Sequence, residues 1–158
     1  MKGDFIKSKL FFLLVSCLLA SCQGNRLYEE YIGFPSLSWA VTDTLAFPLP
    51  SFEPMHPISV IGIRYNQEYE FHNLYVRCFM KDSLGNLEQD TLVNIHLFDS
   101  KTGKPLGKGF GSRLTLYDTL PLSDLSPKST VEFIQYMRMD TLKGIEAVGL
   151  KVMGPKVN

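Results

Sequence analysis

Short segments of alternating apolar and polar residues, separated by turn residues, follow one another from Ile58 towards the end of the chain. None of them repeats its apolar residues at the three-to-four spacing of an amphipathic helix. Several short strands with turn chemistry between them are typical of antiparallel sandwiches. The sequence therefore predicts an all-β fold, an antiparallel β-sandwich, and leaves jelly-roll and immunoglobulin-like topologies open.

This alternation, and the residues that interrupt it, place the individual strands. The expected strands are 39–47, 58–65, 69–80, 91–98, 110–117, 130–139 and 145–153, with turns or loops at 82–89, 99–103 and 121–129. The strand 58–65 is apolar on both faces, which suits a central position in a sheet. Prolines at 48, 50, 54 and 57 predict an extended loop before it. The last two strands are expected to pair with each other across residues 140–144.

The strand at 69–80 carries different kinds of side chain on its two faces. Leu74, Val76, Cys78 and Met80 share one face, whereas Phe71, Asn73, Tyr75, Arg77 and Phe79 share the other. We expect the aliphatic face to lie in the core, with Cys78 as a small buried hydrophobe rather than a reactive thiol.

Tyrosine and arginine recur together on the faces that this pattern turns outward. The residues concerned are Tyr75 and Arg77, Arg113 and Tyr117, and Tyr136 and Arg138. Protein interfaces are enriched in both residue types, so Tyr75, Arg77, Tyr136 and Arg138 are predicted to bind a partner protein. The alternative is that aromatic residues suit strands on either face and have no partner.

The N-terminus has the composition of an export signal. Three lysines precede an apolar run at 10–19, which is too short to cross a bilayer core. Leu19-Ala20-Ser21-Cys22 then resembles a bacterial lipoprotein processing box. We expect a signal peptide at 1–21, which removes Cys17, acyl chains on Cys22, a lipidated N-terminus and tether at 22–36, and a β-sandwich domain at 37–158.

Charge and cysteine content restrict the partners of the processed chain. Removing residues 1–21 takes three lysines and one aspartate from 16 basic and 16 acidic residues, which leaves 13 and 15, a formal charge of −2. A near-neutral domain has no basic stripe to neutralise phosphates, so no nucleic acid is expected to bind. With Cys22 acylated, Cys78 has no cysteine partner within the chain.

The sequence contains no complete motif for nucleotide binding, metal binding or nucleophilic catalysis. The glycine-rich run from Gly103 to Gly111 has three residues, not four, between Gly103 and Gly107, so it fails the P-loop pattern and is expected to be a bulged turn. His56, His72 and His96 have no neighbouring ligands at metal spacing, the aspartates fall near turns, and no serine lies in a nucleophile elbow. We therefore predict no catalytic residues, no metal, no cofactor and no enzyme activity.

Several segments together resemble one protein family. They are Asn73-Leu74-Tyr75, Asp90-Thr91, Leu97-x-Asp99, the glycine run with Leu106-Gly107, and Gln135-Tyr136-Met137-Arg138-Met139-Asp140-x-Leu142-x-Gly144-Ile145-x-x-Val148-Gly149-Leu150. Over about 39–152, and with Cys22, the chain resembles the gliding-motility lipoprotein family GldH of Bacteroidetes-type envelopes. Pro105 departs from the family pattern, which has a tryptophan before Leu106-Gly107.

The resemblance implies a lipoprotein of the gliding apparatus and its coupled protein-secretion machinery, with envelope proteins as partners and no catalytic residues. In this bacterial group an acidic cluster after the lipidated cysteine resembles a signal for export to the cell surface. No such cluster follows Cys22, which favours the periplasmic face of the outer membrane. At the residue level we expect Gly144 in a turn with positive φ, Gly149 at a bulge or a close backbone approach, and Arg138 paired with Asp140. A second function stays open, a glycan- or peptide-binding sandwich. A hydrolase would need a cleft of converging acid and base groups, which these residues do not assemble.

Overall fold

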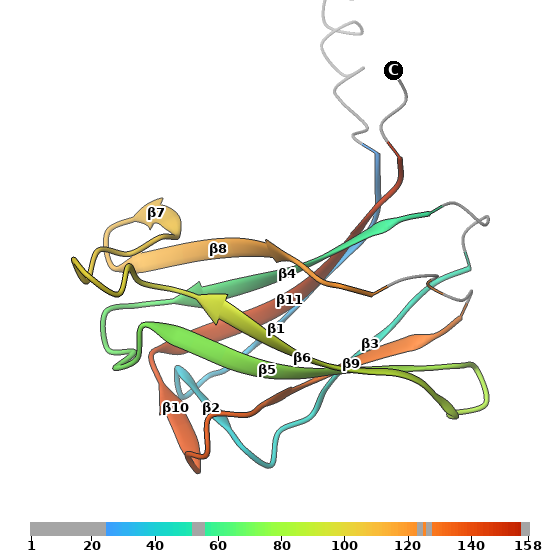
Figure 1. The fold of residues 1–158 in the computed structure, drawn as a ribbon, viewed down its shortest axis with the longest axis horizontal. Helices are drawn as coiled ribbons and strands as arrows, with labels where there is room; N and C mark the ends of the chain where they lie inside the picture. Colours follow the sequence, from blue (N-terminus) through green and yellow to red (C-terminus); the bar gives the residue numbers. More distant parts are fainter. Residues whose placement is uncertain (1–24, 52–55, 123–124, 126–127, 156–158) are drawn as a thin grey trace, which may run out of the picture.

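The computed structural model describes residues 25–51, 56–122, 125 and 128–155 (Figure 1). The predictions for the signal peptide 1–21, for Cys17 and for lipidation of Cys22 lie outside these residues. The described strands are β1 (Arg26–Gly33), β2 (Ser38–Ala40), β3 (Leu45–Pro48), β4 (Ile58–Tyr65), β5 (Asn73–Lys81), β6 (Leu87–His96), β7 (Lys108–Phe110), β8 (Arg113–Thr119), β9 (Thr130–Gln135), β10 (Thr141–Lys143) and β11 (Ile145–Met153).

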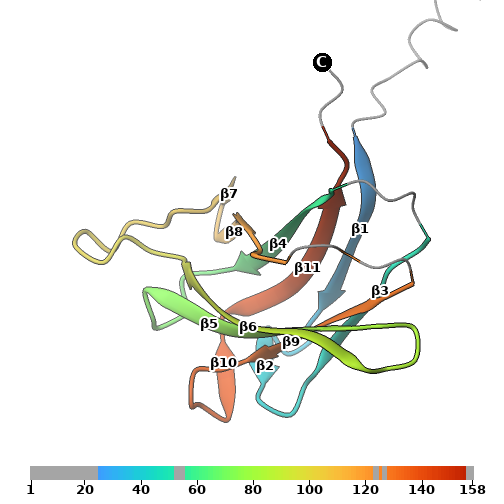
Figure 2. The same cartoon turned by 45° about the vertical axis from the view of Figure 1, so that its right-hand side comes forward.

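The strands form two sheets and a small ribbon. The first sheet has five strands in the order β1-β11-β4-β8-β7, and the second has four in the order β3-β9-β5-β6. A two-stranded ribbon, β10-β2, lies beside them. Every pairing is antiparallel, and Figures 1 and 2 show the sheets as two layers. The predicted all-β antiparallel sandwich is therefore confirmed.

The buried faces of the two sheets follow the predicted alternation. Leu74, Val76 and Cys78 have no exposed surface, which confirms that the aliphatic face of β5 lies in the core. The largest fully buried side chains include Trp39, Tyr65 and Phe133. The buried polar atoms of the two larger ones are paired, because the Trp39 indole N–H donates to the Asp43 carbonyl at 3.0 Å and the Tyr65 hydroxyl donates to the Leu97 carbonyl at 2.7 Å.

Strand β4 coincides with the prediction for 58–65 and occupies the middle of the five-stranded sheet. Strand β5 starts at Asn73 and not at 69, because Asn66 organises a turn there: its side-chain oxygen accepts the Glu68 N–H at 2.9 Å. The predicted strand at 39–47 is two strands, β2 and β3, in different sheets. A turn closed by the Asp43 N–H and the Ala40 carbonyl separates them.

Two predictions about connectivity are wrong. Residues 22–36 were expected to be a tether, but Arg26–Gly33 forms β1 on the edge of the five-stranded sheet, paired with β11. The apolar alternation is broken in this strand, because Glu30 shares a face with Tyr28 and Ile32, which pack against the core. The expected pairing of the last two strands also fails, because β9 lies in the four-stranded sheet and β11 in the five-stranded sheet, with β10 between them along the chain.

Candidate functional site

A groove of about 430 Å³ opens on the outer face of the four-stranded sheet. Its lining comes from β5, β6 and the turn that follows β9: Tyr75, Leu92, Tyr136, Met137 and Arg138. Three of the four residues predicted to bind a partner thus line one groove, and the fourth, Arg77, lies at its border. We call these five lining residues and Arg77 the Tyr/Arg surface.

Tyr75 and Leu92 reach this surface because β5 and β6 turn their odd and even residues to opposite sides. In β5 the even-numbered side chains are buried, so Tyr75 points outward and is 37% exposed. In β6 Val93 and Ile95 are buried, so Leu92 points outward and is 52% exposed. Sequence reasoning missed Leu92, although its place between a polar and a buried residue in the alternation marks it as outward.

Tyr136, Met137 and Arg138 do not continue β9, which corrects the predicted strand 130–139. The strand ends at Gln135, whose side chain is fully buried. Its Nε2 donates to the Met139 carbonyl at 2.6 Å, and its Oε1 accepts the Met137 N–H at 3.0 Å. Gln135 therefore holds the turn from inside. In the sequence, this role of Gln135 was indicated by a polar residue at an inward position of an otherwise apolar strand face.

Arg77 is oriented by an ion pair on the exposed face. Its Nε and one terminal nitrogen donate to the two carboxylate oxygens of Asp90 on β6, at 2.9 and 2.7 Å. This bidentate contact holds the pKa of Asp90 below its usual range and raises the pKa of Arg77. The guanidinium also lies 5.8 Å from the centre of the Tyr136 ring, within cation–π range, so the ion pair places charge beside the groove.

Arg138 offers a second positive charge to the groove. It is exposed and has a φ of 58°, so it lies in the left-handed region and not in a strand. The expected pairing of Arg138 with Asp140 assumed a shared strand face, and among the described residues no ion pair joins the two. The arrangement combines two tyrosines, two apolar side chains and two guanidinium groups in one open surface.

Arg113 and Tyr117, which showed the same residue pattern, lie elsewhere. They belong to β8 in the five-stranded sheet, whose outer face is on the other side of the sandwich. Arg113 donates to Glu146 of β11 at 2.6 Å, and the Lys151 ammonium lies 5.8 Å from the Tyr117 ring centre. The structure therefore does not bring this pair to the Tyr/Arg surface.

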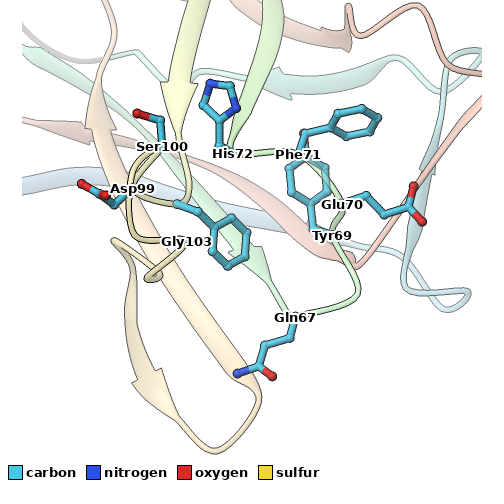
Figure 3. A pocket seen from close by; sticks show the side chains of 9 residues that line it. Gln67, Tyr69, Glu70, Phe71, His72, Asp99, Ser100 and Gly103 are labelled. Carbon is cyan, nitrogen blue, oxygen red and sulfur yellow. The ribbon is translucent and has the colours of Figure 1, made fainter.

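A second concavity of about 300 Å³ lies between the loop before β5 and the turn after β6 (Figure 3). Tyr69 and Phe71 meet edge to face there, with ring centres 5.7 Å apart. Asp99 accepts the N–H groups of Lys101 and Thr102, which confirms the predicted tight turn and occupies its carboxylate. His72 lies 6.2 Å from His96, ring centre to ring centre, and shares this lining with Ser100.

The described residues also bear on three other features: a reactive thiol, a metal site and a membrane-spanning helix. Burial raises the pKa of the Cys78 thiol to about 12, so it stays protonated and unreactive at neutral pH. Within the described ranges, no three His, Cys, Asp or Glu side chains gather as ligands for a metal ion. Those ranges also hold no helix with the length and apolar content needed to span a membrane.

Comparison with known proteins identifies relatives over most of the chain. The sequence profile described as GldH lipoprotein matches residues 26–152. A gliding motility lipoprotein GldH homolog from Christiangramia forsetii is 28% identical over 157 residues, which cover 92% of this chain and 94% of that protein. The gliding motility lipoprotein GldH of Flavobacterium johnsoniae is 28% identical over 106 residues, 66% of this chain and 65% of that protein.

Solved structures resemble the chain only distantly. A carbohydrate binding module from the glycoside hydrolase family 9 protein Cel9A of Ruminococcus flavefaciens has a TM-score of 0.36 and 14% identity, and covers 78% of this chain and 97% of that module. Latent PorU from Porphyromonas gingivalis has a TM-score of 0.33 and 12% identity, and covers 85% of this chain and 14% of that protein. At these scores the likeness carries no argument about function.

Proposed function

The chain belongs to the GldH lipoprotein family, and from that premise we propose that it is a non-enzymatic, membrane-anchored envelope lipoprotein of gliding motility and its coupled protein secretion. It acts by contact with envelope proteins of that apparatus. The observation that supports this mode of action is the Tyr/Arg surface, where residues from β5, β6 and the turn after β9 form one exposed groove.

The anchor in this proposal is the acylated Cys22, on the periplasmic face of the outer membrane. Strand β1 begins at Arg26, four residues later, and four residues reach at most about 14 Å when fully extended. The sandwich therefore stays close to the lipid surface, nearer than a tether up to residue 36 would hold it. A body restricted in this way meets partners that also lie at the membrane.

The Tyr/Arg surface suits a protein partner for two physical reasons. Tyr75 and Tyr136 are 37% and 50% exposed, so a partner could bury apolar area on both of them. Arg77 and Arg138 then supply donors to carboxylates or carbonyl oxygens of that partner. Large aromatic and arginine side chains contribute most of the energy in interface hot spots.

The direct test is partner capture with single substitutions. Tyr75→Ala and Arg138→Gln, each in the full lipoprotein, should leave the melting temperature within about 2 °C because both side chains are exposed. Each should reduce capture of envelope proteins from mildly solubilised membranes several-fold, as hot-spot losses of 1 kcal/mol or more do.

Tyr117→Ala is the matched control, because Tyr117 is 52% exposed but lies on the other sheet. It should capture partners as the unchanged protein does. Equal loss of capture in the control, or loss of stability in step with capture, would count against the surface. Deletion in the native host, with gliding, secretion and growth scored together, tests the wider role.

A glycan- or peptide-binding module is the second candidate, because Tyr75 and Tyr136 line the same groove and exposed aromatic rings can stack on sugars. It predicts binding in a glycan screen that Tyr136→Ala abolishes. Capture of envelope proteins without any glycan binding would favour the first function.

A further inference from the structure

The two sheets have four edges, and these edges differ in how open they are to pairing. Strand β7 has three residues, and β3 has four and ends in Pro48, so both edges offer few backbone groups for pairing with another strand. Strand β1 has eight residues, a register shift near its start, and charges at Arg26, Glu29 and Glu30. Strand β6 is the longest of the four, with ten residues.

The second half of β6 also lacks the features that usually keep an edge strand from pairing with another strand. Residues 91–96 read Thr-Leu-Val-Asn-Ile-His, without Asp, Glu, Lys, Arg, Pro or Gly. The register with β5 is regular along this half, and shifts only near Met80. Exposed edges are normally blunted by charge, proline or bulges, so a long plain edge favours pairing with another strand.

The register shows which backbone groups of β6 are available. The Tyr75 carbonyl accepts the Tyr136 N–H at 2.8 Å, so the polar backbone groups of Tyr75 point to β9 and away from β6. Its partner in register, Asn94, must then turn its own N–H and C=O away from β5. By the same alternation Asp90, Leu92 and His96 turn their backbone N–H and C=O groups away from β5, towards the unpaired edge of β6. Together with Asn94 they supply a row of hydrogen-bond donors and acceptors.

We propose that this edge pairs with β6 of a second copy of the chain, antiparallel and with the two-fold axis at Leu92. This register brings the two Leu92 side chains together, places Asp90 opposite the second copy's Asn94, and places Glu88 opposite the second copy's His96. No like charges meet directly, and each Leu92, now 52% exposed, covers the other. The two four-stranded sheets then form one continuous sheet.

A shared membrane is compatible with this symmetry. In Figures 1 and 2, β5, β6 and β9 lie at about one height, and the start of β1 lies above them. A two-fold axis that relates antiparallel edges within one sheet runs normal to that sheet, so it leaves the first residues of β1 in both copies on the same side. Two lipid anchors could then enter one membrane.

Cysteine cross-linking tests the register in the full lipoprotein in its native membrane. Leu92→Cys places two cysteines in a hydrogen-bonded pair whose Cα atoms are about 5.5 Å apart, within the range of a disulfide. Mild oxidation should convert most of this variant to a disulfide-linked dimer. Asn94→Cys is the matched control on the same edge, because its two copies would be about 14 Å apart, and it should give no dimer.

Association in detergent provides an independent measurement. Light scattering coupled to size exclusion should give the mass of two copies for the unchanged lipoprotein. Leu92→Lys should weaken dimerisation at least about tenfold, because it removes the apolar contact and sets two like charges together, while the far-UV circular dichroism spectrum of the folded chain stays the same. Tyr136→Ala changes the groove but leaves the β6 edge intact, so it should still dimerise, which separates this inference from the proposed function.

Three outcomes would overturn the inference. A single-copy mass at every concentration, with no Leu92→Cys dimer, would show that the edge stays unpaired. Cross-linking of Leu92→Cys to a different protein would assign the edge to a foreign strand. Equal dimer yield from Asn94→Cys would exclude the proposed register.

Discussion

Gly144 has a backbone conformation that side chains disfavour, and it lies against a neighbouring loop. Its φ is 78°, which confirms the expected positive value, and a Cβ atom there would collide with the backbone nitrogen of Tyr69. Gly144→Ala should therefore cost about 2 kcal/mol or more of unfolding free energy in urea. Gly85→Ala is the control, because Gly85 has a φ of 85° but open space around it, and it should cost only about 1 kcal/mol. Equal costs would remove the role of the Tyr69 contact.

Asp99 makes the stability of one turn depend on pH. Its carboxylate accepts the Thr102 and Lys101 N–H groups and the Thr102 hydroxyl, which holds its pKa below the usual range. Since the pKa is lower in the folded state, the stabilisation is complete above the ordinary value of about 3.9 and is lost as pH falls through the folded value.

Asp99→Ala should therefore lower the melting temperature at pH 7, and the difference from the unchanged protein should shrink as the pH falls below about 4. Circular dichroism melts across this range provide the measurement. Asp99→Asn keeps an acceptor oxygen that does not titrate, so it serves as the control. A difference that is the same at neutral and acid pH would contradict the assignment.

At the scale of the element, β1 is held to the sheet by one ring lying across two glycines. Gly149 of β11 pairs with Tyr31 on one side and with Gly62 of β4 on the other. The Tyr31 ring covers both, because a Cβ on Gly149 would come within 2.5 Å of it. The sequence predicted a bulge or a close backbone approach at Gly149; the register is regular there and the group that approaches is a side chain, so that prediction is wrong. The Arg64 guanidinium lies 4.1 Å from the ring centre, and burial raises the pKa of Tyr31.

Gly149→Ala should displace this ring and cost about 1–3 kcal/mol, as overpacking does. In a Tyr31→Ala background the added methyl group meets no ring, so most of that cost should disappear. A double-mutant cycle from urea unfolding measures the difference. Additive costs would show that the ring does not mediate the effect. Hydrogen exchange should report faster opening of β1 in both single variants.

At the scale of the whole molecule, membership of a lipoprotein family anchors the chain in the cell envelope, and the proposed anchor is a set of acyl chains on Cys22. Cys22→Ala should abolish acylation, because no thiol remains to carry the chains, and should release the protein from the membrane fraction. Fractionation with mass spectrometry of the N-terminus checks both. Cys78→Ala is the control, since Cys78 is buried in the core and should not change anchoring. Membrane retention of Cys22→Ala would contradict the proposed anchor.

The sequence alone predicted the features that depend on local alternation. It located β4, the buried face of β5, and the turn at Asp99, because whether a side chain points in or out repeats every two residues along a strand. It also named Tyr75, Arg77, Tyr136 and Arg138 as one set, by residue type. The resemblance to the GldH family rested likewise on residues along the chain.

Pairing between distant segments was decided only in the tertiary structure. That β1 closes the edge of the sheet, that β9 and β11 belong to different sheets, and that Tyr136 lies beside Tyr75 and Leu92 all depend on contacts between residues far apart in sequence. No local pattern encodes which strand lies next to which, because the stabilisation of each pairing comes from the packing of both partners.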